Sequence, residues 1–265
     1  MAYNVSRYGW LPDLPDNRDL KYAAPSGVVR KLPPKVDLSK QCPPVYDQGQ
    51  LGSCTANAIG GAFEFEVLKQ STSSDFMPSR LFIYYNERKI EHTVSTDSGA
   101  QIRDGIKSVH IQGVCPEKMW PYDVNAFAQA PPQGCYTDAM THQVVSYHRV
   151  PRVLNQMKGC LADGYLFVFG FTVYDSFESP TVAKTGKLNM PGKNEKVLGG
   201  HAVAAVGYDD KSSRFIVRNS WGSTWGLKGY FTMPYDYLLE QNLSDDFWTI
   251  RLVEIAPALK KKAKK

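Results

Sequence analysis

The sequence predicts an α+β fold with two lobes, one mainly helical and one β-rich, separated by a cleft. Apolar residues recur at helical spacing in the first half of the chain. Runs rich in Val, Phe and Tyr, separated by turn residues, follow in the second half. Pro131, Pro132 and Gly134 mark the expected crossover between the halves. Because ligand sites commonly lie between two such units, we expect the functional site in the cleft.

Three helices are expected in the first half. The first begins near Cys54 and runs to about Lys69, with its apolar side chains on one stripe. The second is capped by Ser79, which follows a proline, and the third follows Ser98-Gly99. In the second half we expect strands over residues 143–150, 166–173, 201–208, 214–218, 229–233 and 247–255.

The chain divides into three parts. Residues 1–35 are rich in proline and are expected to be extended, because each proline disfavours helix at the residue before it. Trp10, Leu11 and Leu14 are its candidate anchors. Residues 36–255 form one domain, with a mainly helical lobe over about 36–132 and a mainly β lobe over about 133–255. Residues 256–265 are expected to be a disordered lysine-rich tail.

The charge of the chain is concentrated at one end. The formal net charge is +5, and five lysines lie among the last six residues, so the remainder is neutral. A role in nucleic-acid binding would rest on this tail alone, and we expect no specific nucleic-acid partner. The apolar runs are too short to span a bilayer, and the first residues lack the apolar core of a secretory signal. A cytoplasmic location is the default expectation.

The cysteines do not suggest a metal site. Five are present, at positions 42, 54, 115, 135 and 160, with no CxxC pair. The odd number leaves at least one cysteine unpaired in a monomer, while Cys115 and Cys135 are able to pair with each other. We expect no cofactor and no metal.

Cys54 is the candidate nucleophile. It follows the glycine-containing stretch Gln48-Gly49-Gln50-Leu51-Gly52-Ser53 and opens the first helix. The positive end of a helix dipole favours the thiolate, the form of cysteine that attacks electrophiles. The alternative is a small buried cysteine that only opens a core helix.

His201 and Asn219 are the candidate partners of that cysteine. His201 follows two glycines and starts an apolar strand, which places an imidazole at the mouth of a buried element. Asn219 ends a later strand, and its side-chain carbonyl can accept a proton from one ring nitrogen, which leaves the other for the thiol. Trp221 can cover that hydrogen bond and exclude water.

Together these stretches resemble the papain family of cysteine peptidases. The resemblance rests on three motifs in order: the loop from Gln48 to Cys54, Gly200-His201-Ala202-Val203, and Asn219-Ser220-Trp221-Gly222 with the glycine–aromatic residues after it. It covers about residues 36 to 235. It implies a papain-like two-lobed fold, with a helical lobe, an antiparallel β-barrel-like lobe and the active site in the cleft between them.

The resemblance also implies roles for individual residues. Cys54 is the nucleophile, His201 its base and later its acid, and Asn219 orients His201. Gln48 donates its side-chain amide to the oxyanion, beside the backbone N–H of Cys54. The implied substrate-binding residues are Ser98, Gly99, Gly200, Ala202 and Trp221. The implied partner is a peptide or protein substrate, and the implied reaction is hydrolysis through a thioester by an endopeptidase.

Two departures from the family pattern suggest a divergent microbial or viral branch. Leu51 stands where many secreted members carry a cysteine, and Thr55 replaces the aromatic residue that normally follows the nucleophile. Two other functions remain open: an acyl transferase or ligase of the same geometry, and a silent binding protein on the same scaffold. The substrate preference and the oligomeric state are not determined by the sequence.

The N-terminal segment, residues 1–35, is a candidate intramolecular inhibitor. An extended strand can fill a substrate groove, and its prolines withhold N–H groups that a bound substrate would offer. The alternative is that these residues only pad the β-rich lobe.

Overall fold

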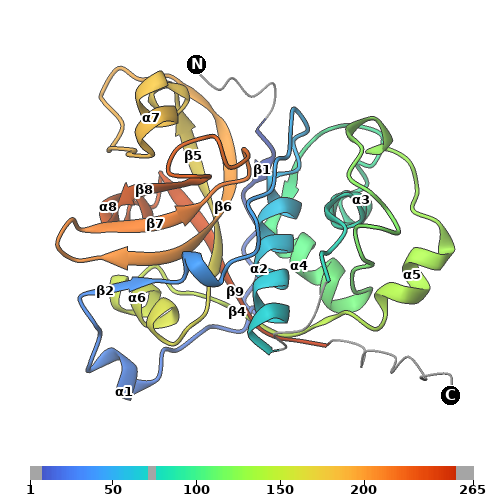
Figure 1. The fold of residues 1–265 in the computed structure, drawn as a ribbon, viewed down its shortest axis with the longest axis horizontal. Coiled ribbons are helices and arrows are strands. Elements are labelled where there is room, and N and C mark those ends of the chain that lie inside the picture. The colour runs from blue at the N-terminus through green and yellow to red at the C-terminus, as the bar shows by residue number, and fades with distance from the viewer. Residues whose placement is uncertain (1–7, 71–75, 255–265) are drawn as a thin grey trace, which may run out of the picture.

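The computed structural model describes residues 8–70 and 76–254, which form two lobes with part of the N-terminal segment between them (Figure 1). The helical lobe lies on one side of the long helix α2, and the sheet lies on the other. This arrangement confirms the predicted two-lobed α+β fold. The predicted tail, residues 256–265, lies outside the described residues.

The helical lobe contains the three predicted helices and two further short ones. Ser79 caps its helix as predicted, because its hydroxyl accepts a hydrogen bond from the backbone N–H of Phe82. The elements are α2 (Cys54–Gln70), α3 (Arg80–Ile90), α4 (Ile102–Ile111), the 3-10 turn η2 (Val124–Ala126) and α5 (Gln133–Ala139).

Helix α2 is buried on nearly every side rather than along one stripe. It packs against α3 and α4 on one side and against β6 and β9 on the other, so polar positions such as Asn57 and Glu66 are also enclosed. The residues of the predicted apolar stripe, Ile59, Ala62, Phe63 and Val67, are all buried, and burial extends beyond them to the other faces of the helix. Small residues such as Gly60 and Gly61 let side chains of neighbouring elements approach closely, with Arg80 and Arg218 next to their Cα atoms.

The β lobe is a seven-stranded sheet in which all neighbouring strands are antiparallel. The strand order is β4-β9-β5-β6-β7-β8, and β2 also pairs with β6. All six predicted strands are present. The strands are β2 (Lys35–Asp37), β4 (Val144–Arg149), β5 (Phe167–Tyr174), β6 (Val197–Asp209), β7 (Arg214–Arg218), β8 (Tyr230–Pro234) and β9 (Ser244–Val253).

The chain crosses between lobes later than the sequence predicts. Cys135 and Ala139 of α5 belong to the buried core of the helical lobe, together with Ile106 of α4. The crossover therefore lies between α5 and β4 and not at residue 132. The β lobe also contains short helices that the sequence analysis does not predict: α6 (Leu154–Ala162), η3 (Asp175–Glu178), α7 (Pro180–Thr185) and α8 (Tyr235–Leu239).

The described part of the N-terminal segment runs from one lobe to the other. Its strand β1 (Trp10–Leu11) pairs in parallel with β3 (Ala100–Gln101), which precedes α4. The short elements α1 (Ser26–Val29) and η1 (Ser39–Gln41) follow it along the chain. Trp10 is buried, whereas Leu11 and Leu14 are 40% and 70% exposed. Of the three predicted anchors, only Trp10 has a buried side chain that anchors the segment.

Within the described ranges, no helix has the length and apolar character that a bilayer crossing requires. The five cysteines all lie in those ranges and are all free thiols. Cys115 nevertheless shares a hydrogen bond with Cys135, so these two thiols are neighbours.

A buried arginine holds the loops of the helical lobe. Arg88 of α3 is fully buried, and it stacks on the ring of Tyr84 at 3.9 Å. Its guanidinium donates to the backbone carbonyls of Val94, Thr96 and Phe127, at 2.9, 2.8 and 2.5 Å. The first two carbonyls belong to the loop that leads to β3. Arg88 therefore fixes the strand on which the N-terminal segment pairs.

We expect Arg88→Met to lower the free energy of unfolding by about 3 kcal/mol, because it leaves several buried carbonyls without donors. Urea unfolding followed by circular dichroism measures this difference. Lys89→Met is the matched control, since Lys89 is the next residue of α3 and is exposed; its expected change is within about 0.5 kcal/mol. Equal shifts for the two variants would contradict this role of Arg88.

Candidate active site

The loop that carries Cys54 is held by both lobes. The backbone N–H of Gln48 donates to the Ser220 carbonyl of the β lobe at 2.9 Å. The backbone N–H of Gly52 donates to the Asp97 carboxylate of the helical lobe at 3.0 Å. Gly49 has φ +58°, a left-handed conformation that glycine adopts without strain. Cys54 then starts α2 in a fixed position between the lobes.

The sulfur of Cys54 lies against strand β6 of the opposite lobe. The backbone N–H of Ala202 points at Sγ, with 3.3 Å between nitrogen and sulfur. The backbone N–H of Gly9, from the N-terminal segment, also hydrogen-bonds this sulfur. Cys54 is fully buried as a result. The structure therefore brings Cys54 next to Ala202, the residue that follows His201 in β6.

His201 is oriented by Asn219. Its Nε2 lies 2.8 Å from Oδ1 of Asn219. An amide oxygen only accepts, so Nε2 carries the ring proton and Nδ1 is left as the proton acceptor. The ring of Trp221 lies 5.1 Å from the His201 ring, at an interplanar angle of 31°, and covers it from one side. The predicted orienting role of Asn219 thus has the required geometry.

Gln48 is joined to Asn219 through Ser220. Oε1 of Gln48 accepts a hydrogen bond from the Ser220 hydroxyl at 2.6 Å, and Oδ1 of Asn219 accepts from the Ser220 backbone N–H at 2.9 Å. Nε2 of Gln48 donates to the carbonyl of Leu51 at 3.0 Å. The sequence analysis quotes Ser220 within a motif but assigns it no role. In the structure it positions both side-chain amides of the site.

The predicted substrate-binding residues surround the N-terminal segment, with one exception. A Cβ atom on Gly99 would lie 2.3 Å from the carbonyl oxygen of Gly9, and one on Gly200 would lie 2.6 Å from that of Trp10. These two glycines therefore allow the close approach of the segment. Ser98 is the exception, since its hydroxyl donates to Thr93 at 2.9 Å.

Ala100, which follows Gly99, makes a backbone hydrogen bond to the segment. Its N–H donates to the Gly9 carbonyl at 2.8 Å. On the other side of Gly9, the Tyr8 hydroxyl donates to Glu178 at 2.6 Å, and its ring lies 5.9 Å from that of His201. Residues 8–10 thus cover Cys54 and His201.

Burial changes the protonation of this pair. Desolvation raises the pKa of Cys54 to about 12, although N–H groups of Ala202 and Gly9 oppose the shift. Desolvation also lowers the pKa of His201 to about 4, although the hydrogen bond that its ring donates to Asn219 opposes the shift. Between these values both groups are neutral. The thiolate predicted from the helix dipole is therefore disfavoured while the segment covers the site.

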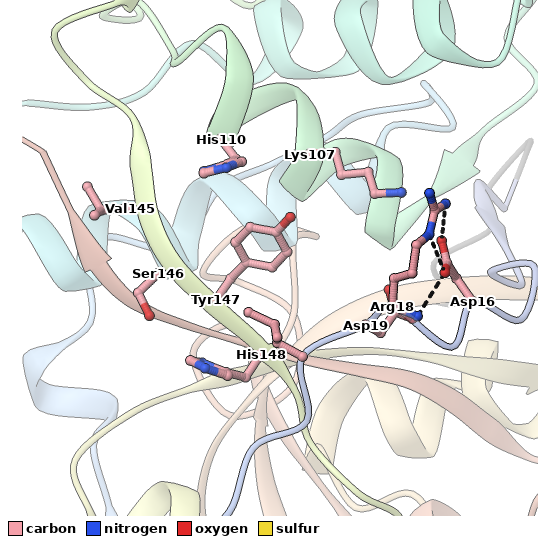
Figure 2. Close-up of a pocket in the computed structure, with 10 residues that line it drawn as sticks. Asp16, Arg18, Asp19, Lys107, His110, Val145, Ser146, Tyr147 and His148 are labelled. Carbon is pink, nitrogen blue, oxygen red and sulfur yellow. Dashed lines mark hydrogen bonds and ion pairs between the residues drawn. The ribbon is translucent and has the colours of Figure 1, made fainter.

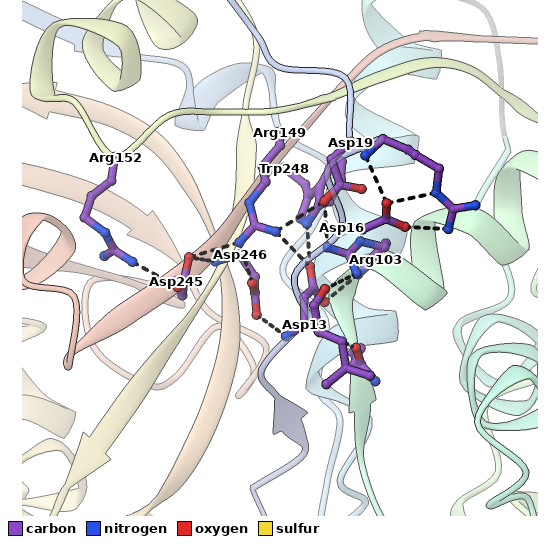
Figure 3. Close-up of polar contacts among 12 residues, drawn as sticks. Asp13, Asp16, Asp19, Arg103, Arg149, Arg152, Asp245, Asp246 and Trp248 are labelled. Atoms are coloured by element: carbon purple, nitrogen blue, oxygen red, sulfur yellow. Dashed lines mark hydrogen bonds and ion pairs between the residues drawn. The ribbon is translucent and has the colours of Figure 1, made fainter.

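A cluster of charged residues anchors the segment beyond Trp10 (Figure 3). Asp13 accepts hydrogen bonds from the indole of Trp248 at 2.8 Å and the backbone N–H of Arg103 at 3.0 Å. The Arg103 guanidinium pairs with Asp19 at 2.6 Å. Burial, and then the nearby Asp246 carboxylate, raise the pKa of Asp13 to about 7.

A separate pocket of about 440 Å³ lies beside this cluster, between the segment, α4 and β4 (Figure 2). Arg18 and Asp16 pair with each other at its rim, and Lys107, His110 and Tyr147 line it. None of the predicted catalytic or substrate-binding residues lines this pocket. Across residues 8–70 and 76–254, no three His, Cys, Asp or Glu side chains are grouped to hold a metal ion.

Comparison with known proteins agrees with this geometry. The family model for papain family cysteine proteases matches residues 32–244. An uncharacterized peptidase C1-like protein of Acanthamoeba polyphaga mimivirus is 44% identical over 274 residues, which cover 94% of this chain and 88% of that protein.

Solved structures agree as well. Xylellain, a cysteine protease from Xylella fastidiosa, matches with a TM-score of 0.86 and 47% identity, over 94% of this chain and 96% of that one. The digestive procathepsin L 3 of the Tenebrio molitor larval midgut shares the fold, with a TM-score of 0.66 and 20% identity over 86% of this chain and 73% of that one. With a family match over most of its length and the Cys54, His201 and Asn219 geometry in the cleft, the chain belongs to the papain family of cysteine proteases.

Proposed function

We propose that the chain is a cysteine endopeptidase that its own N-terminal segment holds inactive. The observation that carries the proposal is the contact of Ala202 N–H with the Cys54 sulfur, beside a His201 ring whose Nε2 is held by Asn219. This contact supports the proposed pairing of Cys54 as nucleophile with His201 as base, because Ala202 is the next residue after His201. The intact Gln48 argues against a silent binding protein, which would not need it.

In the proposed reaction, Nδ1 of His201 accepts the thiol proton as Sγ of Cys54 forms a bond to the peptide carbonyl carbon. The developing oxyanion receives hydrogen bonds from the Cys54 backbone N–H and from Nε2 of Gln48. His201 then gives its proton to the departing amine, and a thioester remains. Water, deprotonated by His201, cleaves the thioester, releases a carboxylic acid and restores the thiol.

The proposed inhibition rests on how Gly9 lies over the sulfur. Its backbone N–H hydrogen-bonds Sγ, while its carbonyl oxygen accepts a hydrogen bond from the Ala100 N–H. The segment therefore occupies the space over the sulfur that a substrate peptide would need. The polar anchors around Asp13 keep it in place. The similarity to a procathepsin supports this proposal, since that protein is named as a pro-form.

We expect Gly9→Ala in the full chain to displace the segment, because the added Cβ would lie 1.7 Å from the backbone oxygen of Gly52. Alkylation of Cys54 by iodoacetamide at pH 7, read by peptide mass spectrometry, should become at least about tenfold faster. Gly27→Ala is the matched control, since nothing lies within 4 Å of its added Cβ. If both variants react as slowly as the parent chain, the segment does not shield Cys54.

The pH dependence of alkylation should differ between the closed and displaced forms. In the parent chain the raised pKa of Cys54, to about 12, keeps the thiol protonated, so its rate should be low at pH 6 and keep rising up to pH 10. In Gly9→Ala, water regains access to the pair, and the rate at pH 6 should already be near its plateau. Parallel pH profiles for the two chains would contradict this expectation.

Catalytic roles are tested in the Gly9→Ala background with an internally quenched peptide library. Adding Cys54→Ala or His201→Ala should lower hydrolysis at least about 10³-fold, and combining them should be no worse than either alone. Adding Asn219→Ala should cost less, about tenfold to a hundredfold, because it only misorients the base. Transfer of the acyl group to an added amine in preference to water would instead favour a ligase.

A further inference from the structure

The two proposed oxyanion donors lie at opposite ends of one loop. The side-chain amide of Gln48 belongs to its first residue, and the backbone N–H of Cys54 follows its last residue, Ser53. Gly49 and Gly52 lie between these ends, and glycine restricts the backbone less than any other residue. The separation of the two donors therefore depends on contacts made from outside the loop.

One tyrosine hydroxyl contacts both ends of this loop. Oη of Tyr122 donates a hydrogen bond to the backbone carbonyl of Gln48 at 2.9 Å, and it lies 2.5 Å from the hydroxyl oxygen of Ser53. Tyr122 belongs to the helical lobe, in the segment between α4 and η2. A single group from outside the loop thus links the residue that carries the first donor with the residue that precedes the second.

This hydroxyl is the last donor in a directed chain of hydrogen bonds. Nη1 of Arg80, which can only donate, lies 3.2 Å from Oδ1 of Asn57, so Nδ2 of Asn57 donates to Oγ of Ser53, at 3.0 Å. At the other end, the Gln48 carbonyl only accepts and takes the single proton of Tyr122, so Ser53 donates to Tyr122. Both ends of the chain therefore fix the same direction, and hydrogen bonds aligned in this way strengthen one another.

The chain is buried and supported by an ion pair. Ser53 and Asn57 are both buried. The guanidinium of Arg80 lies 4.1 Å from the centre of the Tyr122 ring and pairs with Glu117 at 2.8 Å, and Glu117 also accepts the backbone N–H of Tyr122 at 3.1 Å. Burial raises the pKa of Tyr122 to about 12, so at neutral pH the hydroxyl keeps the proton that it donates.

We propose that Tyr122 is a positioning residue of the oxyanion hole, whose hydroxyl holds the loop ends at the separation at which Nε2 of Gln48 and the N–H of Cys54 both reach the oxyanion. This inference rests on the proposed peptidase function. Without the hydroxyl, the two ends lose their shared partner and the donors lose their fixed separation. Misplaced donors weaken hydrogen bonds to a charge that develops only in the transition state, so catalysis should fall and substrate binding should not.

The first test compares catalysis with binding. Tyr122→Phe is added to the Gly9→Ala full chain, and kcat/KM is measured with one internally quenched peptide that Gly9→Ala cleaves. We expect kcat/KM to fall about tenfold. The same peptide, titrated by calorimetry into the Cys54→Ala forms of both chains, should bind equally within about twofold, because the bound peptide carries no oxyanion.

Tyr136→Phe is the matched control. It removes another tyrosine hydroxyl of the helical lobe, which donates to Asn86 at 3.1 Å and does not contact the loop of Cys54. We expect it to leave kcat/KM within about twofold of the Gly9→Ala chain.

A second test separates the oxyanion hole from the nucleophile. Alkylation of Cys54 by iodoacetamide develops no oxyanion, so its rate at pH 7 should stay within about twofold in Tyr122→Phe. The thiol also adds across the carbonyl of a peptide aldehyde, and the resulting thiohemiacetal places its oxygen in the oxyanion hole. The Kd of this aldehyde should rise about tenfold in Tyr122→Phe. In a Gln48→Ala background, Tyr122→Phe should cost less than about threefold in kcat/KM, because the donor that it positions is absent.

Three results would overturn the proposal: equal losses of alkylation and hydrolysis, which indicate a general distortion of the site; an unchanged aldehyde affinity; or an undiminished effect of Tyr122→Phe in the Gln48→Ala background. If Tyr122→Phe does not fold, Ser53→Ala removes the preceding link of the chain and is measured in the same way. A Gly9→Ala chain that binds the aldehyde and cleaves no peptide would reject the peptidase function, while the aldehyde affinities would still decide the role of Tyr122.

Discussion

The contact between the sulfur of Cys54 and the backbone N–H of Ala202 joins the two lobes at the candidate active site. One partner opens α2, which is buried on nearly all sides, and the other lies in β6, which pairs with β2, β5 and β7. Both elements are therefore held by the packing of their own lobe. Rigid supports on both sides are what a nucleophile and its base need, because a small error in their spacing weakens catalysis strongly.

Under the proposed function, the burial of Cys54 and His201 explains why the covered form would be inactive. When residues 8–10 exclude water, the charged forms of Cys54 and His201 lose solvation, and the pKa of each moves towards the neutral state. The strand therefore acts in two ways under the proposed function, by occupying the groove and by removing the solvent that stabilises a thiolate–imidazolium pair.

The described part of the segment is held by polar groups together with the buried side chains of Trp10 and Tyr22. Asp13 and Asp246 bring two buried carboxylates close together, and Arg149 and Arg103 supply the compensating positive charge. Removing one residue from such a network destabilises the folded state strongly, because the remaining partner stays buried without its counterion. The exposed Leu11 and Leu14 add little to this attachment. Glycines at positions 99, 170 and 200 allow the strand and its indole to lie this deep in the cleft.

Local signals in the sequence predicted the strands, the start of one helix and the residues of the candidate site. Alternation and apolar runs predicted all six strands, and Ser79 marked the start of its helix, because these patterns reflect side-chain periodicity and capping within short stretches. The order of the three motifs predicted that Cys54, His201, Asn219 and Gln48 form one site. The sequence also indicated that an extended, proline-containing segment precedes the domain.

Only the tertiary structure decided how these parts meet. It showed that α2 is enclosed by both lobes, that α5 belongs to the helical core, and that Ser220 joins Gln48 to Asn219, since each depends on residues far apart in the chain. It also placed Trp10 against Gly170, Gly200 and Asp246. No local pattern predicts these contacts, because Gly170, Gly200 and Asp246 lie on the three strands β5, β6 and β9, which are distant in the sequence.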